Sequence, residues 1–302
     1  MTEIQPTSQA SLWEAAAKSI ATGAAQKPDR PTLDSMLSKR SIFEGMSYLF
    51  FANTGDGKTY LTQSPVLTGR DVYVLDTETR AIDTRDVQFS QYKDKIKICE
   101  PVVIRADKFV NSTNLDNILD AIDLNATFDN IHNFLMTFAL EVINGKIPKN
   151  SVLVVESVTD FWAWIQHAGK SAQATKKGKR LDEITKDDIE WTPITDKHNK
   201  IILALNSLRS LGITVIYTAR YNDSDTENAR EVRSQKDLPY NIQNIFKLTS
   251  EVRGVTKIYI AQAEKLLGQP AYERFENTTF DKLDQFVRTN IQKIIAGSGV
   301  PK

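Results

Sequence analysis

Residues 48–59 read YLFFANTGDGKT, an apolar run followed by a loop of small residues and the triplet Gly57-Lys58-Thr59. The backbone N–H groups of such a loop, with a helix N-terminus behind them, can surround a triphosphate. At this spacing Lys58 reaches the β- and γ-phosphates and the Thr59 hydroxyl binds Mg²⁺. The sequence therefore predicts a phosphate-binding P-loop between a strand and a helix, with ATP and Mg²⁺ as its ligands.

The start of this loop departs from the usual pattern. Ala52 stands where the motif has its first glycine, so the chain reads A-x-x-x-x-G-K-T. Alanine is small enough for the turn at the strand end, and Gly55 adds backbone freedom. The alternative is an accidental glycine turn between a strand and a helix. The spacing between the apolar run and Gly57-Lys58-Thr59 argues against that alternative. The predicted nucleotide-binding residues are Ala52, Asn53, Thr54, Gly55, Asp56, Gly57, Lys58, Thr59 and Tyr60.

Charge and cysteine content limit the partners and the compartment. Basic and acidic residues each total 38, so a nucleic acid would have to bind a local basic patch. Cys99 is the only cysteine, which excludes internal disulfides and a cysteine metal cluster. The sequence has no signal-peptide pattern and no apolar run near the roughly 18 residues of a membrane span. We expect a cytoplasmic protein that does not enter a membrane.

Three parts are expected along the chain. Residues 1–40 are rich in Ala, Ser, Thr, Gln and Pro and are predicted to form an N-terminal arm, either mobile or docked on a neighbouring subunit. Residues 41–270 alternate apolar strands with amphipathic segments, which predicts an α/β core with a mostly parallel sheet flanked by helices. Residues 271–302 are predicted to form a C-terminal helical tail.

The apolar runs define the elements of this core. Strands are predicted at residues 48–52, 72–76, 95–99, 152–156, 213–218, 244–248 and 257–261, and helices at 129–143, 158–167 and 195–211. The helix after the P-loop must be short because Pro65 ends it within two turns.

Two acidic positions follow predicted strands. Glu156 ends VLVVE, at the position where P-loop proteins hold Mg²⁺, usually with Asp. Asp160, one helical turn later, is the rival metal ligand, and the alternative for Glu156 is an ordinary polar residue at a strand end. Residues 72–79 read VYVLDTET, and this strand is expected next to the P-loop strand. Glu78 would then activate the attacking water, with Asp76 supporting it, unless either residue only caps the next segment.

The order of these motifs resembles the RecA-type ATPase core. VLVVESV resembles the Mg²⁺ strand of that family, and VLDTET resembles the strand whose glutamate activates water. The similarity extends to short, phage-encoded RecA-like proteins related to RadA and described as nucleotide-binding or annealing proteins, which have a strand ending in Thr-Ala-Arg, here residues 218–220. The resemblance covers residues 41–265. It implies that Thr218 or Arg220 senses the γ-phosphate and that the protein assembles into a ring or filament.

The same resemblance implies two DNA-facing loops after the third and fourth core strands. The first is predicted at residues 169–191 as a flexible segment, and the second at 221–237 as a mixed-charge segment without apolar period. The alternative for the first is a solvated surface loop. The predicted DNA-binding residues are Lys170, Lys176, Lys177, Lys179, Arg180, Arg230 and Arg233. Trp191, Trp162 and Trp164 are candidate stacking faces for bases, although a core position is favoured for the last two.

Other residues are assigned more loosely. Lys257 or Lys265 is the candidate to reach a neighbouring subunit's γ-phosphate, and the alternative for each is a surface lysine. The three histidines, His132, His167 and His198, lack metal-ligand spacing and are interpreted as surface or helix residues.

The prediction is an ATPase of RecA type, of viral, phage or mobile-element origin, that uses ATP to control single-stranded DNA binding in recombination or annealing. Lys58, Glu78, Glu156 and Arg220 are its predicted catalytic residues, and Thr59 and Glu156 its predicted metal ligands. One alternative is a helicase or viral genome-packaging motor with the same core. Another is a nucleotide-gated assembly protein, like KaiC-type relatives, in which DNA has no part.

Overall fold

The computed structural model describes residues 41–297 apart from residues 42, 107–118, 120, 222–231, 235–236 and 268. The predicted N-terminal arm lies outside the described residues. So do Arg230 and most of the predicted segment 221–237.

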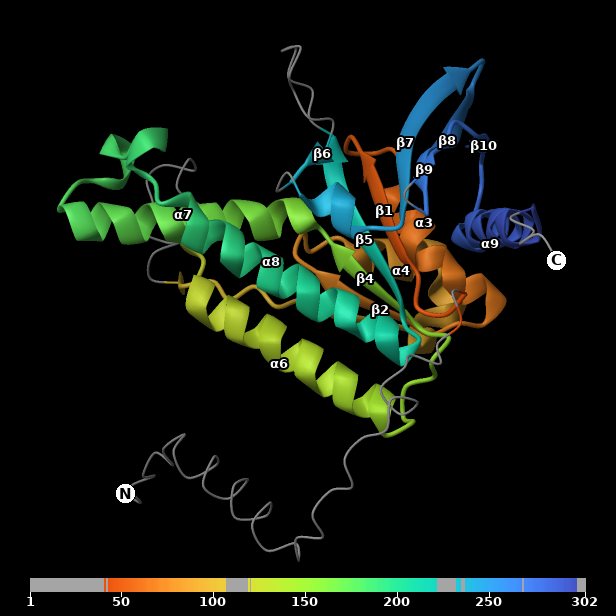
Figure 1. Cartoon of the computed structure of the whole chain (residues 1–302), viewed down its shortest axis with the longest axis horizontal. Coiled ribbons are helices and arrows are strands. Elements are labelled where there is room, and N and C mark those ends of the chain that lie inside the picture. Colours follow the sequence, from red (N-terminus) through yellow and green to blue (C-terminus); the bar gives the residue numbers. More distant parts are fainter. Residues whose placement is uncertain are drawn as a thin grey trace, which may run out of the picture. The chain divides into compact units, whose positions relative to one another are not determined.

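The strands form one sheet that is mostly parallel. Their bounds are β1 Ser47–Ala52, β2 Val72–Asp76, β3 Ile96–Cys99, β4 Val152–Glu156, β5 Thr214–Tyr221, β6 Val232–Arg233, β7 Asn244–Arg253, β8 Thr256–Leu266, β9 Gln269–Pro270 and β10 Arg274–Glu276. The order is β10-β8-β7-β1-β5-β4-β2-β3, with β6 on β5 and β9 on β8 (Figure 1). From β7 to β3 all neighbours run parallel, whereas β8 and β10 are antiparallel. The predicted α/β class is confirmed.

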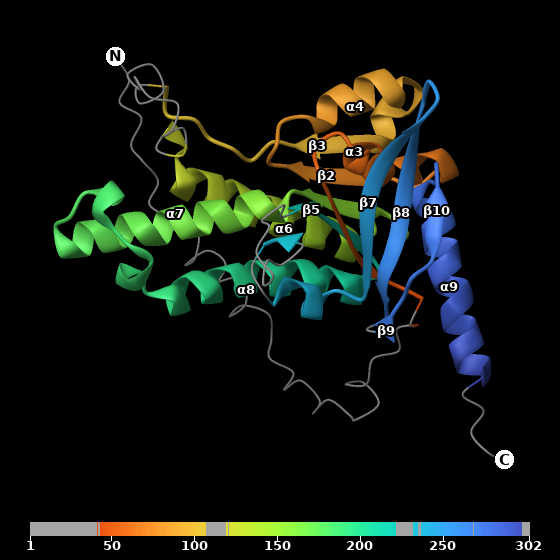
Figure 2. The same cartoon turned by 90° about the horizontal axis from the view of Figure 1, so that it is seen from above.

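Helices cover both faces of this sheet. Their bounds are α3 Lys58–Gln63, α4 Ala81–Gln88, α6 Leu124–Ile143, α7 Val158–Lys177, α8 Trp191–Leu208 and α9 Phe280–Gly297, with 3₁₀ turns such as η1 Ser64–Thr68 and η6 Arg209–Leu211 between them. Figure 2 shows α6, α7 and α8 on one side of the strands, and α3, α4 and α9 on the other. None of the described helices is both long and apolar enough to cross a membrane.

Strand β1 shows how the sequence divides the core into two layers. Leu49 and Phe51 pack with apolar residues of α6, α7 and α8, whereas Tyr48 and Phe50 pack with those of α3, α4 and α9. Every residue of β1 is buried, as expected for a parallel strand covered on both faces. Because β1 lies in the middle of the strand order, the P-loop that follows it lies in the middle of the carboxyl edge of the sheet.

The order of the strands corrects one prediction. Strand β2 does not lie next to β1, because β5 and β4 lie between them. The chain leaves the P-loop through α3, which ends at Gln63 before Pro65 as predicted, and η1 then leads it past two strand positions. A short connection in sequence was thus a poor guide to adjacency. The carboxyl ends of β1, β2, β4 and β5 nevertheless share one edge, because all four strands are parallel.

The prediction of a flexible segment at residues 169–191 is also wrong for the first half of that range. Helix α7 continues to Lys177, and Gly178 ends it in a left-handed conformation with φ of 63°. Alanine, glutamine and lysine are good helix formers, so this polar stretch extends the helix instead of leaving it. Helix α8 then begins at Trp191, four residues earlier than expected.

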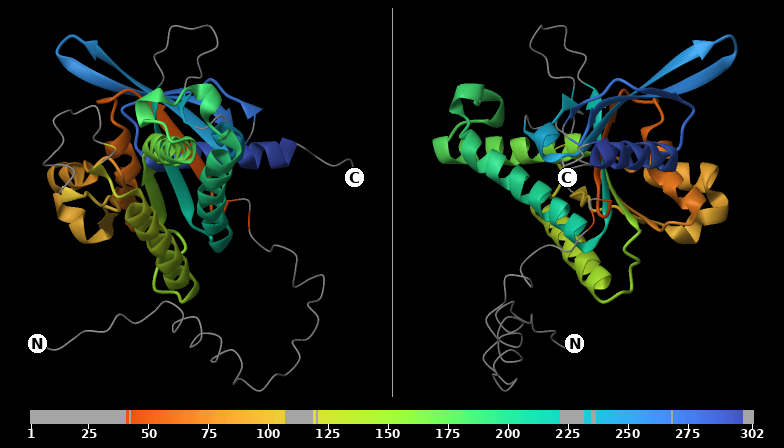
Figure 3. Two further views of the ribbon diagram at one scale, coloured as in Figure 1. Left: turned by 90° about the vertical axis from the view of Figure 1, so that its left-hand side faces the viewer. Right: turned by 45° about the vertical axis from the view of Figure 1, so that its right-hand side comes forward.

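Strands β7 and β8 are longer than predicted. They form a hairpin that extends beyond the end of β1, and Figure 3 shows it projecting from the sheet. The register pairs Phe51 with Lys247, so the second half of β7 runs past the P-loop. Strand β6 is a further departure, since this part of the predicted irregular segment pairs with β5.

The described residues beyond β8, which end at residue 297, are integrated into the core. Strand β10 pairs with β8, and α9 buries Phe280, Leu283 and Val287 against the sheet. The Tyr48 hydroxyl donates to Asp284 of α9, and Arg288 donates to the same carboxylate at 2.9 Å. This helix is consequently held by both apolar and charged contacts.

Candidate nucleotide-binding site

The P-loop lies between β1 and α3, and its backbone adopts a conformation that requires glycine at two positions. Gly55 and Gly57 have φ of 89° and 83°, values that residues with a side chain rarely adopt. A Cβ at Gly57 would lie 3.0 Å from the ring of Tyr259 in β8, so the tight space adds to the backbone conformation in favouring glycine there. Ala52 packs in the core and does not have the positive φ of the two loop glycines, so a methyl group is tolerated at the position of the usual first glycine.

Lys58 begins α3 and folds back over the loop. Its ammonium donates to the carbonyl oxygens of Ala52 and Asn53, both at 3.0 Å. Burial lowers the pKa of Lys58, and the carboxylates of Glu78 and Glu156 oppose that shift. Carbonyl oxygens of the loop thus hold a buried cation, the charge that a polyphosphate needs.

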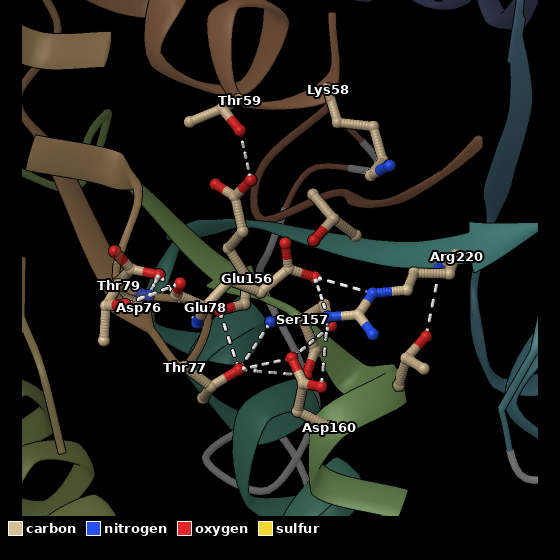
Figure 4. A network of polar contacts seen from close by, with 12 residues as sticks. Lys58, Thr59, Asp76, Thr77, Glu78, Thr79, Glu156, Ser157, Asp160 and Arg220 are labelled. Atoms are coloured by element: carbon tan, nitrogen blue, oxygen red, sulfur yellow. Dashed lines mark hydrogen bonds and ion pairs between the residues drawn. The ribbon is translucent and has the colours of Figure 1, made fainter. Parts of the chain in front are cut away.

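Glu156, at the end of β4, faces the first turn of α3. Its Oε1 accepts a 2.5 Å hydrogen bond from the Thr59 hydroxyl, whereas its buried Oε2 has no partner in the described part of the chain (Figure 4). Burial raises the pKa of Glu156 to about 8. A carboxylate oxygen and a hydroxyl are ligands that Mg²⁺ prefers, so these two residues fit the ion. The rival ligand, Asp160, contacts other residues instead.

Asp76 organises the turn that follows β2. Its two carboxylate oxygens accept from the backbone N–H groups of Glu78 and Thr79, both at 3.0 Å, and of Ala81 at 2.8 Å. Burial raises the pKa of Asp76, and these three hydrogen bonds oppose the shift. Asp76 therefore caps the start of α4, the alternative kept open above, and in doing so it directs the neighbouring Glu78.

Arg220, at the end of β5, lies between two carboxylates. Its guanidinium contacts Glu78 at 3.2 Å and Asp160 at 3.4 Å (Figure 4). Its backbone N–H donates to the Thr159 hydroxyl at 2.9 Å. The predicted residues Glu78 and Arg220 are thus brought together from β2 and β5. Thr218, the other residue suggested as a sensor, is fully buried within β5.

Two hydroxyls that were not predicted join β2 to β4. The Thr77 hydroxyl accepts from the backbone N–H of Ser157 at 2.8 Å and donates to the carbonyl of Glu156 at 2.9 Å. Asp160 accepts from the Ser157 hydroxyl at 2.9 Å and is a second acceptor for the single Thr77 hydroxyl proton at 3.1 Å. The peptide bond between Glu156 and Ser157 is cis. The only sequence sign of this network is that each residue follows the end of a buried strand.

Two adjoining cavities open at this edge of the sheet. The larger, of about 590 Å³, is lined by the P-loop and by residues of α4, β8 and the segment before α9. The smaller, of about 370 Å³, is lined by Thr54, Thr77, Glu78, Arg80, Asp160 and Arg220. Tyr60 lines the larger cavity, with its ring stacked on Phe89 at 5.2 Å. Their size suits a nucleotide, and acidic and basic side chains line both: Lys58 and Glu156 the larger, Asp160 and Arg220 the smaller.

The lysines suggested to act on a neighbouring subunit contact their own chain. Lys257 donates to the carbonyl of Gly55 in the P-loop at 2.8 Å. Lys265 donates to the carbonyls of Pro239 and Ile242 at 2.7 and 2.9 Å. Lys265 therefore has a structural role between β8 and the segment before β7.

The predicted DNA-binding cations at the end of α7 are paired with acids. Lys177 and Lys179 both contact Asp188, at 2.6 and 3.4 Å, and Lys176 contacts Glu190 at 2.7 Å. Arg180 contacts Asp182 at 3.2 Å. No ion pair within the described residues involves Lys170. The side chain of Arg233 lies outside the description. The basic cluster is thus neutralised locally.

The aromatic residues beside this cluster have mixed roles. Trp164 is buried in the core, as favoured above, whereas Trp191 is 40% exposed at the start of α8. The Trp162 ring meets the ring of His198 edge-on, with centroids 5.4 Å apart. His198 lies in α8 and is only 1% exposed, so it is a helix residue and not a surface one, the two interpretations given for the histidines. Burial lowers its pKa to about 4.

A strand, a loop with two left-handed glycines and a helix that begins with Lys58-Thr59 define the class of this fold as a P-loop α/β protein. No family model matches the chain, and no curated protein is similar to it. Among solved structures it is similar to the RadB recombinase, with a TM-score of 0.45 and 15% identity over 77% of this chain and 86% of that chain.

A second similar structure is a KaiC-like protein from the hyperthermophilic archaeon Pyrococcus horikoshii OT3. Its TM-score is 0.41, with 16% identity over 77% of this chain and 85% of that chain. Similarity at this level carries no argument about activity, which rests on the residues of the site.

Proposed function

We propose that this chain is a Mg²⁺-dependent ATPase of RecA type that couples ATP binding and hydrolysis to single-stranded DNA binding in recombination or annealing. The observation that carries the proposal is the meeting of Thr59 and Glu156 beside the P-loop. A buried carboxylate with a partnerless oxygen is costly unless a ligand compensates it. The position of this carboxylate beside Thr59 is where a P-loop ATPase needs a metal ligand.

The loop residues bind and orient the triphosphate. The backbone amides around Gly55 and Gly57 would hold the phosphates, and Lys58 would leave its carbonyl partners to contact the β- and γ-phosphates. Thr59 and Glu156 would hold Mg²⁺, which when bound neutralises charge on the phosphate oxygens. Glu156 must lose its proton to act as a ligand, and the positive charge of bound Mg²⁺ would favour that loss.

Glu78 is the proposed general base. It would accept a proton from the water that attacks the γ-phosphate, so that ATP yields ADP and inorganic phosphate. The Arg220 guanidinium contacts Glu78 at 3.2 Å and would orient this carboxylate toward the attacking water. Arg220 would also contact the γ-phosphate, because it lines the same cavity as Glu78 and Thr54.

The DNA part of the proposal depends on connectivity. Residues 221–237 follow directly after Arg220, so a change of its position on phosphate binding would pass along the chain to them. The basic residues at the end of α7 are the second support. A DNA phosphate would have to displace Asp188 and Glu190 to bind them, and the released counterions would favour that exchange.

The decisive experiment measures ATP hydrolysis with and without single-stranded DNA. We expect Lys58→Ala to abolish turnover, whereas Lys93→Ala, a surface control outside the site, keeps it. DNA stimulation that is lost with K58A would support the whole proposal. Absence of ATP binding by the wild-type chain would refute it. Directional strand displacement would instead indicate a motor, the helicase or packaging alternative.

The local neutralisation of the basic cluster favours a second candidate, a nucleotide-gated assembly protein in which DNA has no part. Here ATP binding would control self-association into a ring or filament. Turnover that is unaffected by DNA, together with ATP-dependent assembly in sedimentation velocity, would favour this candidate.

A further inference from the structure

The β7–β8 hairpin lies against the middle of the P-loop. Strand β7 pairs with β1 up to Lys247 and then continues to Arg253, beside the loop that follows β1. Strand β8 returns alongside and pairs Tyr259 with Ser250. The hairpin therefore presents side chains from two strands to the loop that would bind phosphate.

Consecutive loop residues contact this hairpin. Lys257 donates to the Gly55 carbonyl at 2.8 Å, and the Tyr259 ring lies where a side chain at residue 57 would need space. Between them, the Ser250 hydroxyl donates a 2.6 Å hydrogen bond to Oδ1 of Asp56. The two residues are 194 positions apart in sequence, so only the fold brings them together.

Asp56 is the only acidic residue among residues 52–59, the loop that must accept a highly charged anion. A carboxylate that turns toward bound phosphates opposes their binding by charge repulsion, and at a partly buried site that repulsion is strong. The bond to Ser250 restricts Asp56 to the side of the loop that faces β7. A hydrogen bond to an ionised acceptor is also stronger than a neutral one.

We propose that Ser250 is a positioning residue of the nucleotide site: it holds the Asp56 carboxylate against β7 and so keeps the loop in the conformation that admits a nucleoside triphosphate. The inference rests on the proposed nucleotide binding and adds to it a residue outside the P-loop. Without the serine hydroxyl, Asp56 rotates freely and repels the phosphates. The defect should therefore depend on the charge of Asp56.

The test is a double-mutant cycle on ATP affinity, measured as KM for hydrolysis and as Kd for a fluorescent ATP analogue. We expect S250A to raise both constants about tenfold while kcat changes less than twofold, a loss of about 1.4 kcal/mol of binding free energy. S250T keeps the hydroxyl and should restore most of the affinity. S207A, a matched exposed serine on α8, should leave both constants unchanged.

The charge dependence separates positioning from a structural role. D56N removes the repulsion and keeps an acceptor for Ser250, so we expect a KM about threefold below that of the wild type. In the D56N background, S250A should change KM less than twofold. The ratio of the S250A and wild-type KM values should fall with added salt, because salt screens the repulsion.

Several results would overturn the inference. A tenfold defect of S250A that persists in the D56N background would show that the charge is irrelevant, and thermal unfolding of each variant would then attribute the defect to folding. An S250A variant that binds ATP like the wild type would refute the positioning role but leave the proposed ATPase intact. A wild-type chain that binds no ATP would refute both.

Discussion

Thr59 donates a hydrogen bond of 2.5 Å to Glu156, and this contact joins the first turn of α3 to the end of β4. The two residues are 97 positions apart, and both lie beside the loop of small residues. Their contact places a carboxyl group from a distant part of the sequence beside the P-loop. It also makes the chemistry of Glu156 testable separately from that of the P-loop.

The first prediction concerns the charge of Glu156. Glu156→Gln keeps an acceptor for Thr59 but removes the anionic oxygen, so we expect ATP hydrolysis to fall by about 100-fold or more, with ATP still bound. Steady-state turnover across a Mg²⁺ titration measures this. Asp160→Asn is the comparison, because Asp160 was the rival ligand. A larger change of Mg²⁺ dependence in D160N than in E156Q would assign the metal to Asp160.

The second prediction concerns Glu78 and Arg220. Glu78→Gln should abolish multiple turnover while ATP binding persists, since the base is lost and the phosphate loop is intact. Arg220→Ala should lower turnover and change stability by less than about 1 kcal/mol, because its ion pairs are partly exposed. Turnover, nucleotide binding and urea unfolding of each variant are the measurements. Normal turnover in E78Q would remove Glu78 from the mechanism.

The third prediction concerns the buried His198. Burial lowers its pKa to about 4, below the ordinary value near 6.5, so between these values the unfolded chain binds more protons than the folded one. Stability is therefore lost as pH falls through this window, by about 2 kcal/mol between pH 7 and pH 5. His198→Leu should lack this loss. Urea unfolding of both proteins at the two pH values isolates the contribution from other acids.

The fourth prediction concerns the attachment of α9. Asp284→Ala leaves the buried Tyr48 hydroxyl with only the weakly accepting Met46 sulfur and removes a partner of Arg288, so we expect a loss of about 2–4 kcal/mol of unfolding free energy. Asp86→Ala, at an exposed ion pair, should cost less than about 1 kcal/mol. Similar urea midpoints for the two variants would show that the Asp284 contacts contribute little to stability.

The fifth prediction concerns the paired cations at the end of α7. If their acidic partners mask them, Asp188→Asn should raise affinity for single-stranded DNA and Lys177→Ala should lower it, with a weaker salt dependence for K177A. Fluorescence anisotropy with a labelled oligonucleotide, at several salt concentrations, measures both. Unchanged affinity in both variants would exclude this end of α7 from DNA binding.

The sequence predicted the strands well where burial is uniform. The ranges 72–76 and 152–156 agree with β2 and β4 because both are apolar runs ended by an acid. The P-loop was likewise predictable, since its glycines and Lys58 act locally. Sheet order was not, because it depends on which strand positions α3 and η1 pass, and no local pattern encodes that choice.

The supporting residues of the site were also beyond local patterns. Ser250 reaches Asp56 only because β7 pairs with β1 and continues past it. The sequence marks Asp160 as a candidate metal ligand, but its hydrogen bonds to Thr77 and Ser157 depend on the parallel pairing of β2 with β4. The predicted helix at residues 158–167 ends ten residues before α7 does, because the polar second half of α7 has a composition that suits a loop as well as a solvated helix.

The continuity of α7 has a mechanical consequence. Its first turn carries Asp160, which touches Arg220 at the cavity, and its last turn carries Lys177. Twenty residues of α-helix make a rod about 30 Å long, so the two ends move as parts of one lever. A pivot of about 5° at the cavity end would displace the far end by about 3 Å. The acids that hold the lysines there would then be pulled away from them or pressed closer, without any unwinding in between.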